Sequence, residues 1–172
     1  MMRRSMVGLA IWAATLATGM LAVGPFVPAA QAATEKRAVP YYGSIGASVA
    51  RMRTGPARSY PASWTYRRAD LPVKVIAVFK EWRKVQDPDG TEGWMLAVLL
   101  RNTRTAIVRS SDPLPMRAAP DEGAKTLWRA APGVVGRISE CNGAWCRLDV
   151  KGQAGFVPVG SIWGVDPGEV LP

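Results

Sequence analysis

The sequence predicts an all-β protein in which two small barrels stand in tandem behind an N-terminal export segment. Three observations favour this fold class. Motifs recur at a nearly constant spacing, short runs of β-branched and aromatic residues alternate with turn residues, and no helical periodicity of useful length follows residue 34. Five short strands in about 55–60 residues suit a strongly bent, partly open barrel.

The first 32 residues have the three parts of a secretory signal peptide. Arg3-Arg4 gives the basic start, residues 5–34 carry no charge, and Ala30-Gln31-Ala32 is an A-x-A site before Ala33. We expect cleavage between Ala32 and Ala33, which leaves a periplasmic or secreted protein with no stable membrane span. The alternative, an uncleaved membrane anchor, is disfavoured by Gly24-Pro25. The general secretion route fits better than the twin-arginine route.

The composition limits the chemistry that the protein can perform. It has no histidine, which removes Ser–His–Asp and Cys–His nucleophile systems and His-ligated metal sites. A Ser–Lys pair stays open but has no support. We therefore expect no catalytic residues, no cofactor and no metal, and we interpret the acidic stretch Asp87–Glu92 as a turn rather than a Ca²⁺ site.

The charge balance is basic but gives little information about a partner. The chain has 22 Lys+Arg against 13 Asp+Glu, and removal of Arg3 and Arg4 with the leader leaves 20 against 13, or +7. Basic exported chains often meet anionic polymers or lipid head groups. The charges are dispersed and no nucleic-acid motif is present, so nucleic acid is not expected as a partner.

The two cysteines predict one structural disulfide. Cys141 and Cys146 flank Asn142-Gly143, a strong hairpin turn signal, and a four-residue loop would place them opposite each other on paired strands. An exported protein reaches a compartment in which such a bond forms and persists. The spacing does not fit redox-active C-x-x-C chemistry.

A tandem repeat organises the rest of the chain. Met52 aligns with Met116, Trp82 with Trp145 and Gly93 with Gly155, at offsets of 64, 63 and 62 residues. We divide the chain into a signal peptide (1–32), a linker (33–45), a first domain (46–109) and a second domain (110–172). In the first domain we expect a long loop over Arg53–Asp70, a helical turn over Ala97–Leu100, and a last strand that closes the barrel. The expected strands are Ala47–Met52, Val73–Phe79, Trp82–Gln86, Glu92–Leu96 and Thr105–Val108.

These motifs resemble those of bacterial SH3-like domains, and most closely those of an exported proteobacterial family with two such domains in tandem. The resemblance covers nearly the whole mature chain. One departure is Met95-Leu96, where the family often has Val-His. The motifs are Met52–Pro56, Tyr60-Pro61, Trp64, Tyr66–Arg68, Leu71–Val73, Trp82-Arg83 and Asp87–Trp94 in the first copy, and Arg117, Pro120, Gly133–Gly136, Cys141, Trp145-Cys146, Gly155-Phe156 and Ile162–Glu169 in the second.

The resemblance implies a ligand groove beside the long first loop of each barrel. In the first copy we expect aromatic walls there, which would hold an extended peptide or a sugar face. Arg53, Arg67 and Arg68 flank the loop and could pair with a carboxylate, such as one on a wall stem peptide. The alternatives are core packing for the aromatic residues and a solvated face for the arginines. The expected groove residues are Tyr60, Trp64, Tyr66, Arg67, Trp82 and Trp94.

The second copy is a weaker candidate for ligand binding. Its matching loop has Trp128 as the single aromatic residue and carries Asp121-Glu122. We expect this copy to act as a structural partner, with Trp163-Gly164 closing the second barrel or filling the contact between the barrels.

The resemblance and the residues together predict a non-catalytic periplasmic binding module. Its expected partner is peptidoglycan, through a stem peptide or the glycan, or else an envelope protein. One alternative is a scaffold adaptor that joins envelope proteins and binds no glycan. An unrecognised wall enzyme is the third hypothesis, and it lacks the usual catalytic groups.

Overall fold

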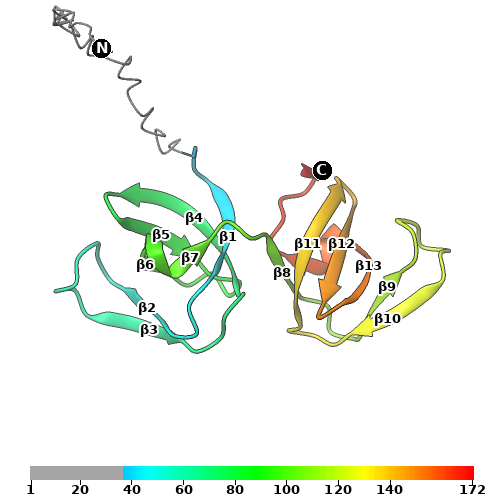
Figure 1. Cartoon of the computed structure of the whole chain (residues 1–172), viewed down its shortest axis with the longest axis horizontal. Helices are drawn as coiled ribbons and strands as arrows, with labels where there is room; N and C mark the ends of the chain where they lie inside the picture. The colour runs from blue at the N-terminus through cyan, green and yellow to red at the C-terminus, as the bar shows by residue number, and fades with distance from the viewer. Residues whose placement is uncertain (1–36) are drawn as a thin grey trace, which may run out of the picture. The chain divides into compact units, whose positions relative to one another are not determined.

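The computed structural model describes residues 37–172, which form two bent β-sheets and two short 3₁₀ turns (Figure 1). This confirms the all-β fold class with two tandem barrels. The expected signal peptide and its cleavage point at Ala32 and Ala33 lie outside the described residues. In the part of the chain that the structure describes, no helix is both long and apolar enough to cross a bilayer.

The first sheet has the strand order β3-β2-β6-β5-β4-β1-β7, and its neighbouring strands are antiparallel. A 3₁₀ turn, η1 (Ala97–Leu99), joins β6 to β7. It confirms the helical turn expected there. The strands are β1 (Tyr41–Ile45), β2 (Ala50–Arg53), β3 (Ala62–Tyr66), β4 (Pro72–Phe79), β5 (Trp82–Gln86), β6 (Glu92–Leu96) and β7 (Leu100–Arg101).

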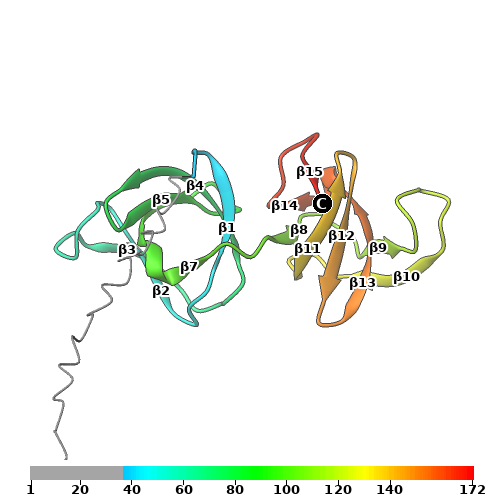
Figure 2. The same cartoon turned by 45° about the horizontal axis from the view of Figure 1, so that its top comes forward.

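The second sheet repeats this order as β10-β9-β13-β12-β11-β8-β14. Each strand of the first sheet has its counterpart seven strands later, which confirms the duplication. The short strand β15 is an addition that pairs with β11 near the C-terminus (Figure 2). The strands are β8 (Thr105–Val108), β9 (Leu114–Arg117), β10 (Thr126–Ala130), β11 (Val135–Asn142), β12 (Trp145–Val150), β13 (Gln153–Pro158), β14 (Ile162–Trp163) and β15 (Val170–Leu171), with the 3₁₀ turn η2 at Val159–Ser161.

One strand was assigned to the wrong barrel, and one strand was missed. Thr105–Val108, expected to close the first barrel, pairs with β11 and β14 in the second sheet. Its counterpart in the first sheet is β1, which lies in the segment that we interpreted as a linker. A two-residue edge strand, β7, occupies the closing position instead. We propose that the domain boundary lies between Arg101 and Thr105.

The long loop Arg53–Asp70 was also incorrectly predicted as irregular throughout. It contains β3, which pairs with β2 to form a hairpin that projects Trp64. A register shift follows Met52, so one extra residue of β3 lies between the pairs Met52–Trp64 and Arg53–Ala62. The aromatic residues of this segment therefore belong partly to a sheet, and their directions are fixed by strand pairing.

Each barrel has its own core. In the first, the buried side chains come mainly from β1, β2, β4, β5 and β6, with Met52, Val85 and Met95 among them. The second core is built from the matching strands and includes the predicted disulfide. Cys141 and Cys146 are bonded across β11 and β12, with their Cα atoms 4.1 Å apart. The Asn142 side chain accepts hydrogen bonds from the backbone of Ala144 and Trp145, which holds the turn between the two cysteines.

Trp163 has both of the roles that were expected as alternatives. It lies on β14, which pairs with β8 and so closes the second barrel. Its ring is also perpendicular to that of Tyr42 from the first barrel, with 5.3 Å between ring centroids. The Tyr42 hydroxyl donates to Asp166, and Lys74 forms an ion pair with the same carboxylate at 2.7 Å. Residues 36–172 accordingly form one compact unit.

Candidate functional site

The strand β2 presents two arginines on the face opposite the first core. Ala50 and Met52 are buried, and because side chains alternate along a strand, Arg51 and Arg53 point to the other side. Arg53 pairs with Trp94 of β6, and Trp94 pairs with Lys84 of β5. Side chains directly opposite on paired strands share a face. The outer face of β2, β6 and β5 therefore combines cationic and aromatic groups.

A groove of about 270 Å³ lies on this outer face. Trp82 forms part of its lining and is only 3% exposed, yet it is not part of the core on the inner face. Val49, at 47% exposure, lies at the groove with its side chain open to solvent. The groove thus has an apolar base and a basic side. Its lining residues are Val49, Arg51, Arg53, Trp82, Leu96 and Leu99.

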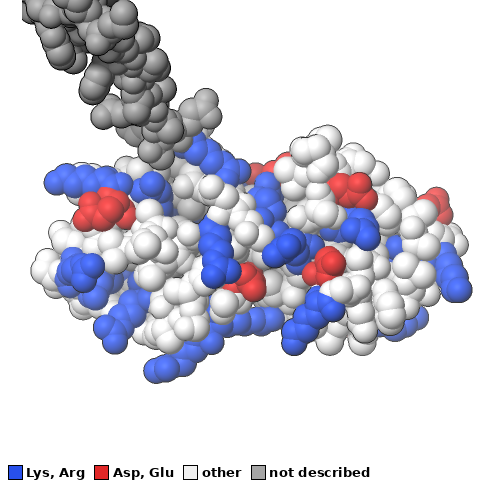
Figure 3. Space-filling view, viewed as in Figure 1, with Lys and Arg blue, Asp and Glu red and all other residues white. Residues whose placement is uncertain are grey.

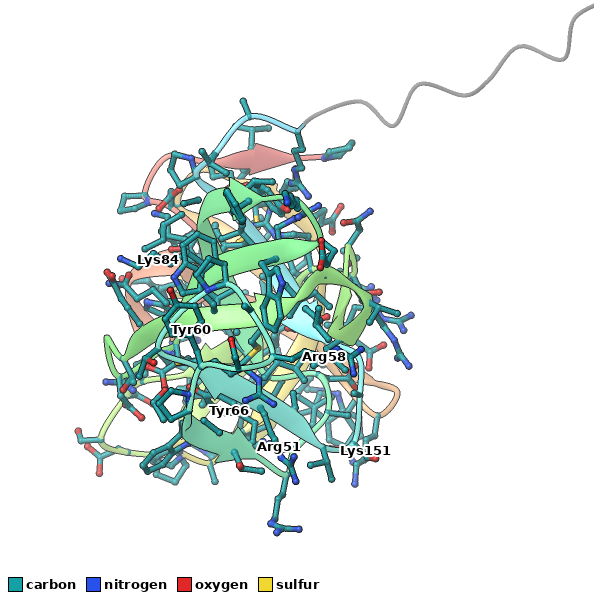
Figure 4. All side chains as sticks on the ribbon, turned by 90° about the vertical axis from the view of Figure 1, so that its left-hand side faces the viewer. Arg51, Arg58, Tyr60, Tyr66, Lys84 and Lys151 are labelled. Atoms are coloured by element: carbon teal, nitrogen blue, oxygen red, sulfur yellow. A yellow bond between two sulfur atoms is a disulfide. The ribbon has the colours of Figure 1, made fainter. Side chains whose placement is uncertain are left out.

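The charged side chains at this face differ in their partners. The Lys84 ammonium is 2.7 Å from Glu92, and the Arg53 guanidinium donates to the backbone carbonyl of Tyr60 at 2.6 Å. Among residues 37–172 no ion pair involves Arg51, whose residue is exposed. Arg53 has no ion pair either, but its guanidinium is held by the Tyr60 carbonyl, so within the described residues Arg51 is the groove cation with neither an ion pair nor a side-chain hydrogen bond. Figure 4 views the end of the molecule with this hairpin and labels Arg51, Arg58 and Tyr60.

Only part of the predicted groove set lies together. Trp82 lines the groove and Trp94 is half-buried on the same face of the sheet. Tyr60 is 46% exposed in the hairpin loop, close to Gly55. Trp64 is 58% exposed, and its pairing with the buried Met52 places it on the core-facing side of the hairpin, away from the groove face.

The remaining two predicted residues are placed elsewhere. Tyr66 is buried in the first core and donates a hydrogen bond of 2.7 Å to Asp87. Burial, and then this hydrogen bond to a carboxylate, raise the pKa of Tyr66 above its usual value. Arg67 is exposed, just after the end of β3. Tyr66 is a packing residue in this structure, which matches the core alternative considered for the aromatic set.

The Asp87 side chain holds the turn formed by the acidic stretch that follows β5. Its carboxylate accepts hydrogen bonds from the backbone of Asp89 and Thr91 as well as from Tyr66. This is the turn that the composition indicated. Within residues 37–172, no group of three or more acidic or cysteine side chains is arranged to hold a metal ion.

Sequence reasoning missed Arg51, Val49, Leu96 and Leu99. The signal for Arg51 was present, because Ala50-Arg-Met-Arg53 alternates small or apolar residues with arginines and so predicts two arginines on one face. Val49, Leu96 and Leu99 gave no comparable signal. Their contribution depends on how η1 and the residues before β2 approach each other in the folded barrel.

A larger cleft, of about 590 Å³, is lined by the loop between β3 and β4 and by strands of the second sheet. Its walls carry charges of both signs, including Arg68, Asp70, Arg137 and Asp149, and none of its lining side chains is aromatic. Arg68 is already engaged there by the carbonyl of Gly133. We favour the smaller groove as the candidate site because it combines an aromatic base with a cation that is free of ion pairs.

Comparison with known proteins agrees with this architecture. The family model for the bacterial SH3 domain matches twice, over residues 46–101 and 110–164. The chain therefore belongs to the bacterial SH3 domain family, as a tandem member. Domains of this family are of the binding type and are commonly cell-wall-binding modules.

Two solved structures are similar to the chain at a low level. They are NlpC1 and NlpC2 from Trichomonas vaginalis, each 11% identical with a TM-score of 0.33. The alignments cover 76% and 74% of this chain and 48% and 51% of the respective structures, so the chain spans about half of their length. No curated protein matches the chain.

Proposed function

We propose that the protein is a non-catalytic module of the bacterial envelope that binds peptidoglycan through the groove of its first domain. The observation that carries this proposal is the position of Arg51, a cation without an ion pair beside the Trp82 and Leu96 side chains. An extended stem peptide would lay its apolar parts on this base, and its carboxylate would pair with the guanidinium. Family membership supports the binding role.

Two further features support action outside the cytoplasm. The Cys141–Cys146 disulfide is of a kind that persists in oxidising compartments. The sequence of residues 1–32 has the pattern of a cleaved signal peptide. Lys and Arg side chains are spread over the face seen in Figure 3, with fewer acidic ones between them, which suits an anionic polymer.

Co-sedimentation of the mature chain, residues 33–172, with insoluble sacculi tests the proposal. The wild-type chain is expected in the pellet at low salt, and Arg51→Gln should weaken binding by about ten- to a hundredfold, since a charge-assisted pair contributes about 1.5–3 kcal/mol. Lys151→Gln is the matched control because it removes the same charge from the larger cleft. Wild-type protein that stays in the supernatant would contradict peptidoglycan binding.

A protein adaptor is the second candidate function. Val98 on η1 is 84% exposed, and Val49 beside the groove is also open, so apolar surface is offered to a partner there. Crosslinking the tagged chain in intact cells would capture such a partner. Loss of the crosslink in a Val98→Asp variant, together with no binding to sacculi, would favour the adaptor over the wall module.

A further inference from the structure

Each domain presents one exposed tryptophan at the same place in its first hairpin. Trp64 of β3 pairs with Met52 of β2, and Trp128 of β10 pairs with Met116 of β9. The four residues are related by the same offset of 64. Trp64 is 58% exposed and Trp128 is 42% exposed, while both methionines are buried.

Other residues that the two hairpins share have a clear structural purpose. The Arg53 guanidinium donates to the carbonyl of Tyr60, and that of Arg117 donates to the carbonyl of Ala124, seven residues further along in each case. Both bonds hold the loop at the tip of the hairpin. Retention of these arginines follows from folding alone.

The glycines that precede Trp94 and Phe156 are explained in the same way. A side chain at Gly93 would collide with Met52, and one at Gly155 would come within 2.8 Å of the Met116 Cβ. Glycine at these two positions lets β6 approach β2, and lets β13 approach β9, closely enough to close each barrel.

Folding does not explain the two tryptophans. A large aromatic ring that stays about half exposed leaves much of its apolar face in water, and the surroundings have changed between the copies without replacing it. Tyr60 corresponds to Ala124, and Tyr66 to Ala130, so the neighbouring aromatic residues are lost in the second domain. A ring that is kept while its neighbours change indicates contact with something outside the chain.

The changes between the copies also indicate what the rings contact. In the second domain Pro115 stands where the first has Arg51, and the hairpin loop carries Asp121 and Glu122. The paired strand carries Arg129 opposite Pro115, where the first domain has Thr65, so a cation remains on the hairpin but the arrangement around Arg51 is not repeated. Stacking of an indole on the apolar face of a sugar ring needs no such charge, and it is the feature that both hairpins retain.

We propose that Trp64 and Trp128 are equivalent contacts for sugar rings of one repeating glycan strand, so that the two domains bind the wall polymer together. This inference rests on the proposed function and extends it to the second domain. Two linked sites on one polymer bind more tightly than either site alone, by about 10²–10⁴-fold where both can engage. The Arg51 groove then adds a stem-peptide contact in the first domain only.

The test uses the mature chain and two probes. Long glycan strands freed of stem peptides should bind the wild type, and Trp64→Ala or Trp128→Ala should each weaken that binding at least tenfold. The double variant should lose it. With a short disaccharide fragment, calorimetry should give two sites for the wild type and one for either single variant, with unchanged affinity at the site that remains.

Leu127→Ala is the control for loss of exposed apolar surface, because Leu127 is 44% exposed beside Trp128 on the same strand and is the extra, unpaired residue at the register shift of this hairpin. It should bind as the wild type does. Trp128→Phe keeps an aromatic face and should recover part of the binding, and thermal unfolding of every variant should match the wild type within a few degrees.

The possible results separate the two proposals. If Trp128→Ala binds long strands as well as the wild type, the bivalent inference is overturned, while sacculi binding that depends on Arg51 would leave the proposed function intact. Wild-type protein that binds neither sacculi nor glycan strands overturns both. A variant that loses binding and also unfolds would place the tryptophan in the fold, which likewise overturns the inference.

Discussion

The two domains share a strand order but fill the same core position in opposite ways. In the first domain Ala50 is paired with Tyr66, and in the second Leu114 is paired with Ala130. The large residue has moved from one strand of the hairpin to the other while all four remain buried. The fold therefore depends on the summed volume and the inward direction at this pair rather than on either residue.

The domains also differ in the specific interaction that supplements each hydrophobic core. The first uses a buried polar link, in which the Tyr66 hydroxyl donates to Asp87. The second has no tyrosine at that position and carries the Cys141–Cys146 bond at the turn between β11 and β12. Since the small barrels have limited cores, each has one additional stabilising interaction. In the first domain it is a buried hydrogen bond, and in the second it is a disulfide.

The largest expected effect comes from breaking the Ala50–Tyr66 pair. Tyr66→Ala removes a buried aromatic ring and its hydrogen bond, and should lower the free energy of unfolding by about 3–5 kcal/mol. Urea denaturation followed by tryptophan fluorescence measures it. Adding Ala50→Leu should restore part of the loss, because it recreates the Leu–Ala pair of the second domain. If the double variant is less stable than Tyr66→Ala, the equivalence of the two core positions is wrong.

Loss of the disulfide should have a smaller effect. Replacing both Cys141 and Cys146 by Ala should reduce the free energy of unfolding by about 2 kcal/mol, near the low end of the usual range, because the bond closes a loop of only a few residues. Reduction of the wild type with dithiothreitol should produce the same shift in the urea midpoint. The first domain has no cysteine. A shift that appears only in the unfolding of the first domain would therefore contradict the stabilisation of the second domain by the disulfide.

The sequence predicted strands best where short runs with apolar residues are bounded by turn residues. β5 and β6 have the predicted limits because Asp87–Gly90, a turn by composition, separates the run that holds Trp82 and Val85 from the run that holds Trp94 and Met95. β1 was missed because Gly43 and Ser44 have low strand propensity. Their place in the sheet depends on long-range packing, since a side chain at Gly43 would come within 2.8 Å of the Arg101 carbonyl oxygen.

The candidate site was harder to predict than the fold because it depends on which face each side chain occupies. Trp82 and Trp94 were correctly placed on neighbouring strands. Trp82 pairs with Leu96 and Trp94 with Lys84, which puts both tryptophans on the groove face. Trp64 and Tyr66 were assigned to a loop, although the pairing of β3 with β2 turns both toward the core side. A one-residue register shift in this hairpin determines which face each side chain of β3 occupies. No local pattern in the sequence indicates this shift.

The smallest expected effect comes from an ion pair that is specific to the second domain. The Arg104 guanidinium donates to both oxygens of Glu169 and to the carbonyl of Gly164, and so ties the segment before β8 to the chain end. The hydrogen bond from Arg104 holds the pKa of Glu169 below its usual value of 4.5, although partial burial opposes it. A lowered folded-state pKa means that the contribution is present above the unfolded-state pKa and is lost as the pH falls through the folded value.

Glu169→Gln tests this pair because glutamine keeps the shape but does not titrate. The wild type should lose stability between about pH 5 and pH 3, measured as the thermal unfolding midpoint, and the variant should show a shallower loss over the same interval with a lower midpoint at neutral pH. Glu92→Gln is the matched control, because Glu92 pairs with Lys84 in the first domain and is more exposed. Equal pH profiles for wild type and Glu169→Gln would show that the Arg104 pair contributes nothing to the difference between the domains.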